Sequence, residues 1–248
     1  MKPIFWNTLR ERCYVPYSNT EDVCFVKGKS EKLYPGVRIE NISFPLTIEP
    51  VQAAIFSCLS EGDRPEKLYS PKIMNTENEL LKPDNSLEQW ANRFHLSVTY
   101  LEEGEPIPDN ALFYTSEKQI THDPKRLLEL TDRCLITYSR FPVTALLKTE
   151  KGVYSGVNIE ISDWQKGLCA ERVAIGKARS CGARDFLEMA IYAPQGDYIS
   201  PCGACRQVLA EHMHKGRITM FHNDSETTSL QIEDLLPYQF KASRLNPS

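Results

Sequence analysis

Short apolar runs alternate with amphipathic stretches along most of the chain, and this pattern predicts strands alternating with helices. Strand-like runs cover Val23–Val26, Gly36–Ile39, Val143–Lys148, Gly152–Ile159, Leu187–Ala193 and Ile218–Phe221. Helical stretches cover Phe5–Arg12, Val51–Glu61, Pro124–Tyr138, Cys169–Ala178 and the segment from Pro201 to His214. Such alternation indicates an α/β architecture in which helices pack on a mixed sheet.

The stretch from Pro124 to Tyr138 shows how these helices are recognised. Leucines at 127, 128, 130 and 135 combine the i+3 and i+4 spacings of one helical face. Asp123 followed by Pro124 is a favourable helix start, a capping residue with proline in the first turn. We therefore expect a helix that runs to Tyr138.

The second half of the chain repeats the first at an offset of 120 residues. Arg38-Ile39-Glu40 parallels Asn158-Ile159-Glu160, and Ile48-Glu49-Pro50-Val51 parallels Leu168-Cys169-Ala170-Glu171. An internal duplication is the simplest account, and a chance match between short segments is the alternative. We predict two tandem α/β/α domains, residues 1–112 and 121–248, separated by the Pro-containing, polar segment Glu102–Thr121.

Composition and charge exclude several classes of protein. The chain has ordinary hydrophobic and charged fractions, 41% and 25%. No apolar run approaches the ~20 residues that span a membrane, and the start is not that of a secretory signal. The first 120 residues carry 13 basic and 18 acidic side chains, and the remainder carries 16 and 15. Neither half has the basic surplus of a protein that binds chiefly phosphates, so nucleic acid is an unlikely partner.

Eight cysteines are present, and an even number is compatible with disulfides. The chain is long, however, and has enough apolar residues for a core of its own. We therefore expect a reduced, cytoplasmic protein in which some thiols bind metal.

Two cysteine motifs in the second half carry the most specific chemistry. They are Cys169-Ala170-Glu171 and Pro201-Cys202-Gly203-Ala204-Cys205, each at an expected helix start. Zinc prefers thiolates in tetrahedral geometry, and a catalytic zinc keeps one position for water. Cys202 and Cys205 are one helical turn apart, and Pro201 suits the first turn. Helix N-termini also favour the thiolate form.

Glu171 is the candidate proton carrier beside this metal site. Its spacing from Cys169 works only if Cys169 lies at the helix junction and Glu171 reaches in from the first turn. A carboxylate there can take a proton from water and deliver it to a substrate. Three thiolates leave a net negative zinc core, which Arg172 and Arg206 could offset, although both could be ordinary surface arginines. A structural zinc needs a fourth protein ligand. Cys181, His212 and His214 are the nearby candidates, and their positions in the sequence do not indicate that any of them reaches the metal.

Residues 134–237 resemble the cytidine deaminase family. The matching segments are Tyr138–Val143, Asn158–Glu160, Cys169–Arg172, Ile199–Val208 and Glu233–Pro237. Zinc deaminases carry an H-x-E…P-C-x-x-C signature with an all-cysteine variant, and this chain has the all-cysteine form. The resemblance implies two cytidine-deaminase-like domains and hydrolysis of cytidine and deoxycytidine to uridine and deoxyuridine plus ammonia, a reaction of pyrimidine salvage.

The resemblance also implies residue roles. One zinc per chain is held by Cys169, Cys202 and Cys205, and Glu171 shuttles protons. Asn158 and Glu160 bind the ribose hydroxyls, and Phe141 packs on the nucleoside. The Ala170 N–H holds the base carbonyl, and the Ser200 carbonyl faces the departing amine. From the residues alone, Phe141 could instead be a core aromatic, and Asn158 and Glu160 could be polar residues at a strand end.

The first half resembles the family in degenerate form. Segments Cys13–Ser18, Ile39–Asn41, Phe44–Leu46 and Ser60–Gly62 fit the pattern. Glu49 stands where the first metal ligand belongs, Val51 stands where the catalytic carboxylate belongs, and no PCxxC follows Ser70-Pro71. We expect this half to be inactive and to replace a neighbouring subunit, so that a homodimer forms a pseudo-tetramer.

The sequence is also compatible with other functions. The substrate could be a modified cytosine nucleoside, a cytosine-bearing antibiotic or a base in single-stranded nucleic acid, although the last calls for a basic groove with stacking aromatics. A non-catalytic zinc scaffold is the alternative outside enzymes, and it has no need of Glu171.

Overall fold

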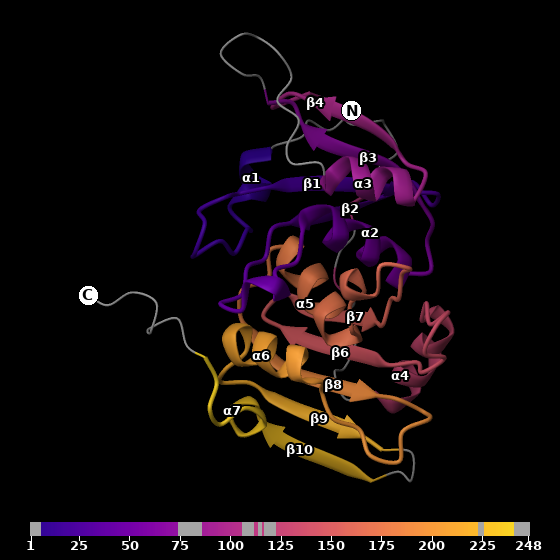
Figure 1. Cartoon of the computed structure of the whole chain (residues 1–248), viewed down its shortest axis with the longest axis vertical. Coiled ribbons are helices and arrows are strands. Elements are labelled where there is room, and N and C mark those ends of the chain that lie inside the picture. The colour runs from indigo at the N-terminus through magenta and orange to yellow at the C-terminus, as the bar shows by residue number, and fades with distance from the viewer. Residues whose placement is uncertain are drawn as a thin grey trace, which may run out of the picture.

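The computed structural model describes residues 6–73, 86–105, 112–113, 116, 123–222 and 226–240. Two five-stranded mixed sheets lie one above the other, with helices α2 and α5 between them (Figure 1). This confirms the predicted α/β architecture. Among the described residues there is no helix of the length and apolar character that crossing a membrane requires.

The first sheet has the strand order β4-β3-β1-β2-β5. β1 is antiparallel to both β2 and β3, whereas β4 is parallel to β3 and β5 is parallel to β2. Its elements are α1 (Trp6–Arg10), β1 (Val23–Gly28), β2 (Lys32–Val37), the 3₁₀ turn Phe44–Leu46, α2 (Pro50–Ser60), β3 (Pro65–Pro71), α3 (Ser86–Arg93), β4 (Ser97–Leu101) and β5 (Leu112–Phe113).

The second sheet has the order β10-β9-β8-β6-β7. β6 is antiparallel to β7 and β8, β9 is parallel to β8, and β10 is antiparallel to β9. Its elements are α4 (Pro124–Leu130), the 3₁₀ turn Thr131–Arg133, β6 (Thr144–Thr149), β7 (Gly152–Val157), the 3₁₀ turn Trp164–Lys166, α5 (Ala170–Ser180), β8 (Phe186–Tyr192), α6 (Gly203–His212), β9 (Arg217–Phe221), β10 (Thr227–Gln231) and α7 (Ile232–Leu235).

The two halves share a core of four strands, and they differ in the fifth, because β5 pairs with β2 whereas β10 pairs with β9. Strands β1 to β4 correspond to β6 to β9, and the single-residue bridges repeat as well. Ile39 pairs in parallel with Tyr14 and antiparallel with Ile48, and Ile159 pairs in the same way with Leu135 and Leu168. The offset in the structure is therefore the one seen in the sequence. The boundary between 112 and 121 falls almost entirely outside the described residues and stays a prediction.

Helices cover both faces of the second sheet. The Thr144 hydroxyl donates to the Leu127 carbonyl of α4, while α5 lies against Gly156, the cross-strand partner of Ala145. Because neighbouring residues of a strand face opposite sides, α4 and α5 lie on opposite faces.

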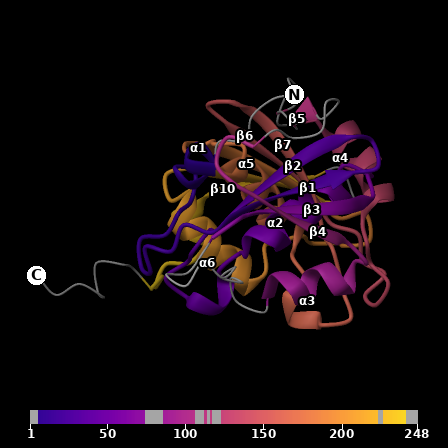
Figure 2. The ribbon, with the colours of Figure 1, turned by 90° about the horizontal axis from the view of Figure 1, so that it is seen from above.

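The central helices approach their sheets too closely for a side chain at two matched glycines. A Cβ on Gly36 would lie 1.9 Å from the Pro50 carbonyl oxygen, and one on Gly156 would lie 2.1 Å from that of Ala170. Glycine at these positions lets the first turns of α2 and α5 pack against β2 and β7. In the view of Figure 2, the strands of the first sheet lie over α2.

A buried ion pair joins the halves where α2 ends. Lys177 of α5, 1% exposed, donates to Glu61 at 2.5 Å and to the Ser155 hydroxyl at 3.4 Å. Arg133 lies 3.7 Å from the other Glu61 oxygen. The contact between α2 and α5 is therefore held by charge as well as by apolar packing.

The helix expected to run from Pro124 to Tyr138 is shorter than its leucine pattern suggested. It ends at Leu130, followed by a 3₁₀ turn to Arg133. Leu135 instead donates its N–H to the Asn158 carbonyl, and its own carbonyl accepts from the Glu160 N–H. Leu135 therefore pairs with the extended segment at residues 158–160 and does not continue the helix. The Asp123 side chain caps the shorter helix as expected.

Candidate metal centre and active site

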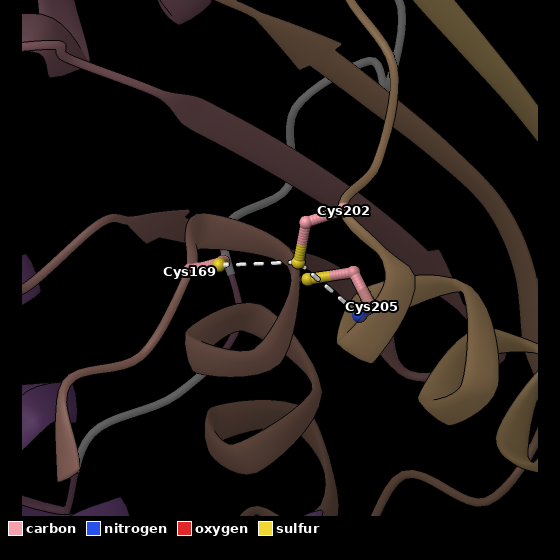
Figure 3. Close-up of side chains that lie close together, drawn as sticks. All are labelled: Cys169, Cys202 and Cys205. Atoms are coloured by element: carbon pink, nitrogen blue, oxygen red, sulfur yellow. Dashed lines mark hydrogen bonds between the residues drawn. The ribbon is translucent and has the colours of Figure 1, made fainter. Parts of the chain in front are cut away.

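The three predicted metal-ligating cysteines lie at the N-terminal ends of two helices. Cys169 is the N-cap of α5 and Cys202 is the N-cap of α6, both with extended backbone angles. Cys205 lies in the first turn of α6 and is fully buried. The sulfur atoms point toward a common point (Figure 3). Pro201 precedes the N-cap, so the expectation that it occupies the first turn of α6 is wrong.

The spacing of the sulfur atoms suits a tetrahedral metal. All three lie within 4.8 Å of one another, and Cys169 Sγ and Cys202 Sγ are 3.7 Å apart. Zn–S bonds of about 2.3 Å at tetrahedral angles imply sulfur separations of about 3.8 Å. The residues present therefore fit zinc without rearrangement of the backbone.

Local polarity favours the thiolate form of Cys202, whereas hydrogen bonds with the neighbouring thiols, together with burial, raise the pKa values of Cys169 and Cys205. Cys202 Sγ accepts from the Cys205 N–H at 3.5 Å, as an N-cap side chain does. Hydrogen bonds from the Cys169 and Cys205 thiols and from that N–H lower the pKa of Cys202.

Glu171 is enclosed beside the sulfurs. It is the second residue of α5 and is 3% exposed, while Cys169 is the N-cap of that helix. This is the arrangement that the sequence required, with Cys169 at the helix junction and Glu171 in the first turn. Within the described chain, its buried Oε2 has no hydrogen-bond partner. Burial, followed by the charge of Cys202, raises the pKa of Glu171 to about 7. An unsatisfied buried carboxyl oxygen next to three thiols is an expected feature where a water or substrate atom binds.

The two arginines after the cysteine motifs are held differently. Arg172 is only 8% exposed, so it is not an ordinary surface arginine, and it donates to the Leu46 carbonyl of the first half at 3.1 Å. Its Nε has no partner among the described residues. Arg206 donates to the Pro201 carbonyl and to the Ser200 hydroxyl at 2.9 and 2.7 Å, and so holds the segment before Cys202.

The segment Asn158–Glu160 lies directly beside Cys169. Ile159 and Leu168 exchange both backbone hydrogen bonds, at 2.9 and 3.0 Å. The Asn158 amide donates to the Phe141 carbonyl and accepts from the Val143 N–H, both at 2.9 Å. Asn158 therefore also fixes the loop that carries Phe141. Phe141 is 38% exposed and is not a core aromatic.

The remaining predicted site residues occupy the surrounding backbone. Glu160 accepts from the Tyr138 and Ser139 N–H groups at 2.9 and 3.0 Å. Burial alone would raise the pKa of Glu160, but the hydrogen bonds from Ser139 and Tyr138 outweigh it and lower that pKa. Ala170 is the first residue of α5 and fully buried, and Ser200 is half-buried just before Cys202.

Reasoning from the sequence missed the support that the first half gives to α6. The Glu211 carboxylate accepts from the Tyr14 and Tyr17 hydroxyls and from the Ile42 N–H at 3.1, 2.9 and 2.8 Å. Next to it, His212 lies 3.2 Å from the Glu40 carbonyl oxygen. No local pattern marks Glu211, because its partners are roughly 170 to 200 residues away in the sequence.

Comparisons with known proteins identify the family of the chain. Residues 119–220 match the family model described as the cytidine and deoxycytidylate deaminase zinc-binding region. A cytidine deaminase of Sporosarcina psychrophila is 40% identical over 119 residues, covering 46% of this chain and 86% of the relative. A probable cytidine deaminase of Dictyostelium discoideum is 36% identical over 110 residues, covering 44% and 74%.

The solved structures to which the chain is similar include two cytidine deaminases. The cytidine deaminase of Burkholderia pseudomallei is 31% identical, covers 47% of this chain and 94% of its own, and has a TM-score of 0.44. That of Mycobacterium tuberculosis is 30% identical, covers 47% and 93%, and has a TM-score of 0.41. On the sequence relatives, this protein is an enzyme of the hydrolase class. It belongs to the cytidine deaminase family.

Proposed function

We propose that the protein catalyses the zinc-dependent hydrolytic deamination of cytidine and deoxycytidine, and that it acts in pyrimidine salvage in the cytoplasm. The observation that supports this best is the placement of Glu171. Its unpartnered, buried carboxyl oxygen lies beside a thiol triad whose spacing suits zinc. A purely structural metal site needs a fourth ligand in place of such a carboxylate.

Cys169, Cys202 and Cys205 would hold one zinc ion per chain. When bound, zinc supplies a Lewis acid that makes a water molecule nucleophilic near neutral pH. The buried Arg172 guanidinium, with its Nε unpartnered among the described residues, offsets part of the negative charge of three thiolates. Arg206 keeps the loop before Cys202 in place through Ser200 and Pro201.

Glu171 moves the protons of the reaction. It takes a proton from the attacking water and delivers it to N3 of the cytosine ring as the oxygen adds to C4. A second proton passes from the new hydroxyl group through Glu171 to the exocyclic nitrogen. The C4–N4 bond then breaks, and the products are ammonia and uridine. Burial raises the pKa of Glu171, and this favours a carboxyl group that both takes up and releases protons.

Five further residues would place the nucleoside. Asn158 and Glu160 hydrogen-bond the ribose hydroxyls, and Phe141 packs on the nucleoside from its half-exposed position. The Ala170 N–H holds the base carbonyl at the start of α5. The Ser200 carbonyl accepts from the departing amine. Support for this arrangement comes from the Ile159–Leu168 pairing, which sets the ribose-binding pair beside the metal ligands.

The first half would be catalytically inactive and would act as a built-in neighbour of the active half. Val51 occupies the position that corresponds to Glu171 and cannot transfer a proton. We also propose domains of residues 1–112 and 121–248, and a homodimer that forms a pseudo-tetramer. Mass measurement in solution tests the assembly, and a fully active monomer contradicts it.

The function is tested by ammonia release from cytidine, deoxycytidine and their monophosphates, with zinc measured on the same sample. We expect turnover of both nucleosides and a zinc content of one per chain. Cys205→Ser removes one thiol of the cluster. Cys181→Ser is its matched control, because it removes a thiol outside the cluster. Activity confined to single-stranded nucleic acid, or zinc without turnover of any cytosine substrate, contradicts the proposal.

A further inference from the structure

A cavity of about 410 Å³ opens in the first half, within the range of sites for small ligands. It lies at the N-terminal end of α2, between that helix, strands β1 and β3, and the start of α3. Its walls include the apolar side chains of Val23, Val51 and Leu87. The proposed chemistry of the second half does not use this cavity.

The cavity occupies the place that the active site occupies in the other half. Thr20, Arg38, Glu49, Pro50 and Val51 all line it. At the repeat offset of 120 to 121 residues, these positions correspond to Phe141, Asn158, Cys169, Ala170 and Glu171. The corresponding secondary-structure elements also match, so the duplicated fold has kept a hollow where the metal ligands have been replaced.

Contacts of Glu49 explain how the hollow persists without a metal. At the N-cap of α2, its Oε2 accepts from the Ser86 hydroxyl at 2.5 Å and from the Trp90 indole N–H at 2.6 Å. Trp90 is 2% exposed. These bonds tie the start of α2 to α3, much as a metal held by Cys169 and Cys202 would tie α5 to α6.

Polar groups at the cavity can recognise a ligand. Ser70, 1% exposed, lines the cavity and places a hydroxyl group in its wall. Arg38 stands where Asn158 does, and its Nε donates to Glu40 at 3.0 Å. Its Nη1 lies 3.9 Å from Asp22.

The charge balance of the walls selects against anions. Among the described lining residues, two guanidinium groups, from Arg10 and Arg38, face three carboxylates, from Glu21, Asp22 and Glu49. A neutral molecule meets no net repulsion there, whereas a phosphate dianion does. Apolar walls combined with hydroxyl and guanidinium donors suit a flat heterocycle that carries hydroxyl groups.

We propose that this cavity binds a neutral pyrimidine nucleoside without converting it, as a second nucleoside site separate from the active site. The choice of nucleoside rests on the proposed function, because it assumes that the matched pocket of the second half binds one. Turnover does not occur here, since neither a thiol triad nor a carboxylate at position 51 is present.

The test is equilibrium dialysis of radiolabelled uridine against the full chain, because uridine is the proposed product and is not consumed. Ile73→Trp fills the mouth of the cavity from a side chain that is 41% exposed, so the fold tolerates it. Leu187→Trp, at a side chain 44% exposed in the second half, is the matched control. Asn158→Ala weakens the active site alone.

We expect two uridines per chain in the wild type and in Leu187→Trp, and one in Ile73→Trp. Asn158→Ala should still bind uridine in the cavity of the first half, which is the uridine that Ile73→Trp no longer binds. Ser70→Ala, a milder change, weakens the cavity site about two- to tenfold through one lost hydrogen bond. Uridine monophosphate binds the cavity at least tenfold more weakly than uridine.

A single uridine per chain that Asn158→Ala removes overturns the proposal, and so does a second uridine that neither Ile73→Trp nor Ser70→Ala affects. Tighter binding of the monophosphate overturns the assignment to a neutral ligand. These outcomes are distinct from failure of the proposed function. If the proposed function fails, the protein does not turn over cytidine, but its cavity still binds the uridine that is lost in Ile73→Trp.

Discussion

Replacement of Glu171 by glutamine separates proton transfer from metal binding. Glutamine has nearly the same shape, so it fits a site that is 3% exposed and leaves the fold intact. It cannot accept and release a proton at neutral pH. Because Oε2 of Glu171 has no partner among the described residues, the change breaks no structural hydrogen bond at that atom. Zinc should therefore remain bound by the three cysteines.

The expected loss of rate follows from the role assigned to this carboxylate. A positioned general acid or base contributes about 10²- to 10⁴-fold, which corresponds to roughly 3–5 kcal/mol of activation free energy. Because Glu171 serves more than one proton transfer, we expect kcat to fall by at least about 10³-fold. KM for cytidine should change far less, since ribose and base contacts come from other residues.

The assay is the fall in absorbance as cytidine becomes uridine, with ammonia and zinc measured on the same samples. Glu188→Gln is the matched control, because that carboxylate lies on β8, 3.3 Å from Lys148 and away from the cysteines. It should retain wild-type rates. Ammonia release by Glu171→Gln within tenfold of the wild type, with zinc still bound, refutes the mechanism.

Four further predictions follow from particular contacts. Cys205→Ser removes a buried sulfur of the triad, so zinc measured by atomic absorption should fall from one per chain to near zero. Glu61→Ala leaves the buried Lys177 without its carboxylate and should lower the free energy of unfolding in urea by about 3–5 kcal/mol. Glu211→Ala removes an acceptor shared by three donors of the first half and should lower the same quantity by about 2 kcal/mol. Burial lowers the pKa of His212 from 6.5 to about 3. As the pH falls, His212 is therefore protonated in the unfolded chain at a higher pH than in the folded chain. Stability should fall as pH drops from about 6.5 toward 3, by up to ~1.4 kcal/mol per unit, and His212→Asn should flatten this dependence.

Each of these changes has a control on the same chain. Cys181→Ser should leave the zinc content at one. Glu66→Ala and Glu233→Ala remove exposed carboxylates and should each alter the unfolding free energy by less than about 0.5 kcal/mol. His214→Asn makes the same substitution at an exposed histidine and serves as the control for His212→Asn. A full zinc content in Cys205→Ser, losses below 1 kcal/mol for the two glutamate variants, or an unchanged pH slope in His212→Asn contradicts the corresponding argument.

The local pattern predicted most elements because each carries its own signal. The helix starts at Cys169 and Cys202 were expected from their motifs, and both residues are N-caps. The helix after Asp123 was predicted too long, because Leu135 reads as part of an apolar helical face. Its backbone pairs instead with residues 158 and 160, and only the folded chain brings that segment near.

The candidate site shows the same division. Residue type and spacing point to Cys169, Cys202, Cys205 and Glu171, because few other arrangements provide three soft ligands and a proton carrier. The burial of Arg172 was left open, and it depends on Leu46 from the other half. No local sequence pattern marked Glu211 as a residue that joins the two halves.

By itself, the sequence determined the succession of strands and helices, the repeat at 120 residues, and which half keeps the thiols and the carboxylate. These are properties of short segments, since periodicity, helix caps and ligand spacing act within a few residues. Only the tertiary structure decided how the halves support each other through Lys177, Arg172 and Glu211, and that a cavity survives beside Glu49. The contacts of Lys177, Arg172 and Glu211 join segments more than 100 residues apart, and those of Glu49 join segments 37 and 41 residues apart. Packing and burial set which of these groups meet, and no local pattern encodes them.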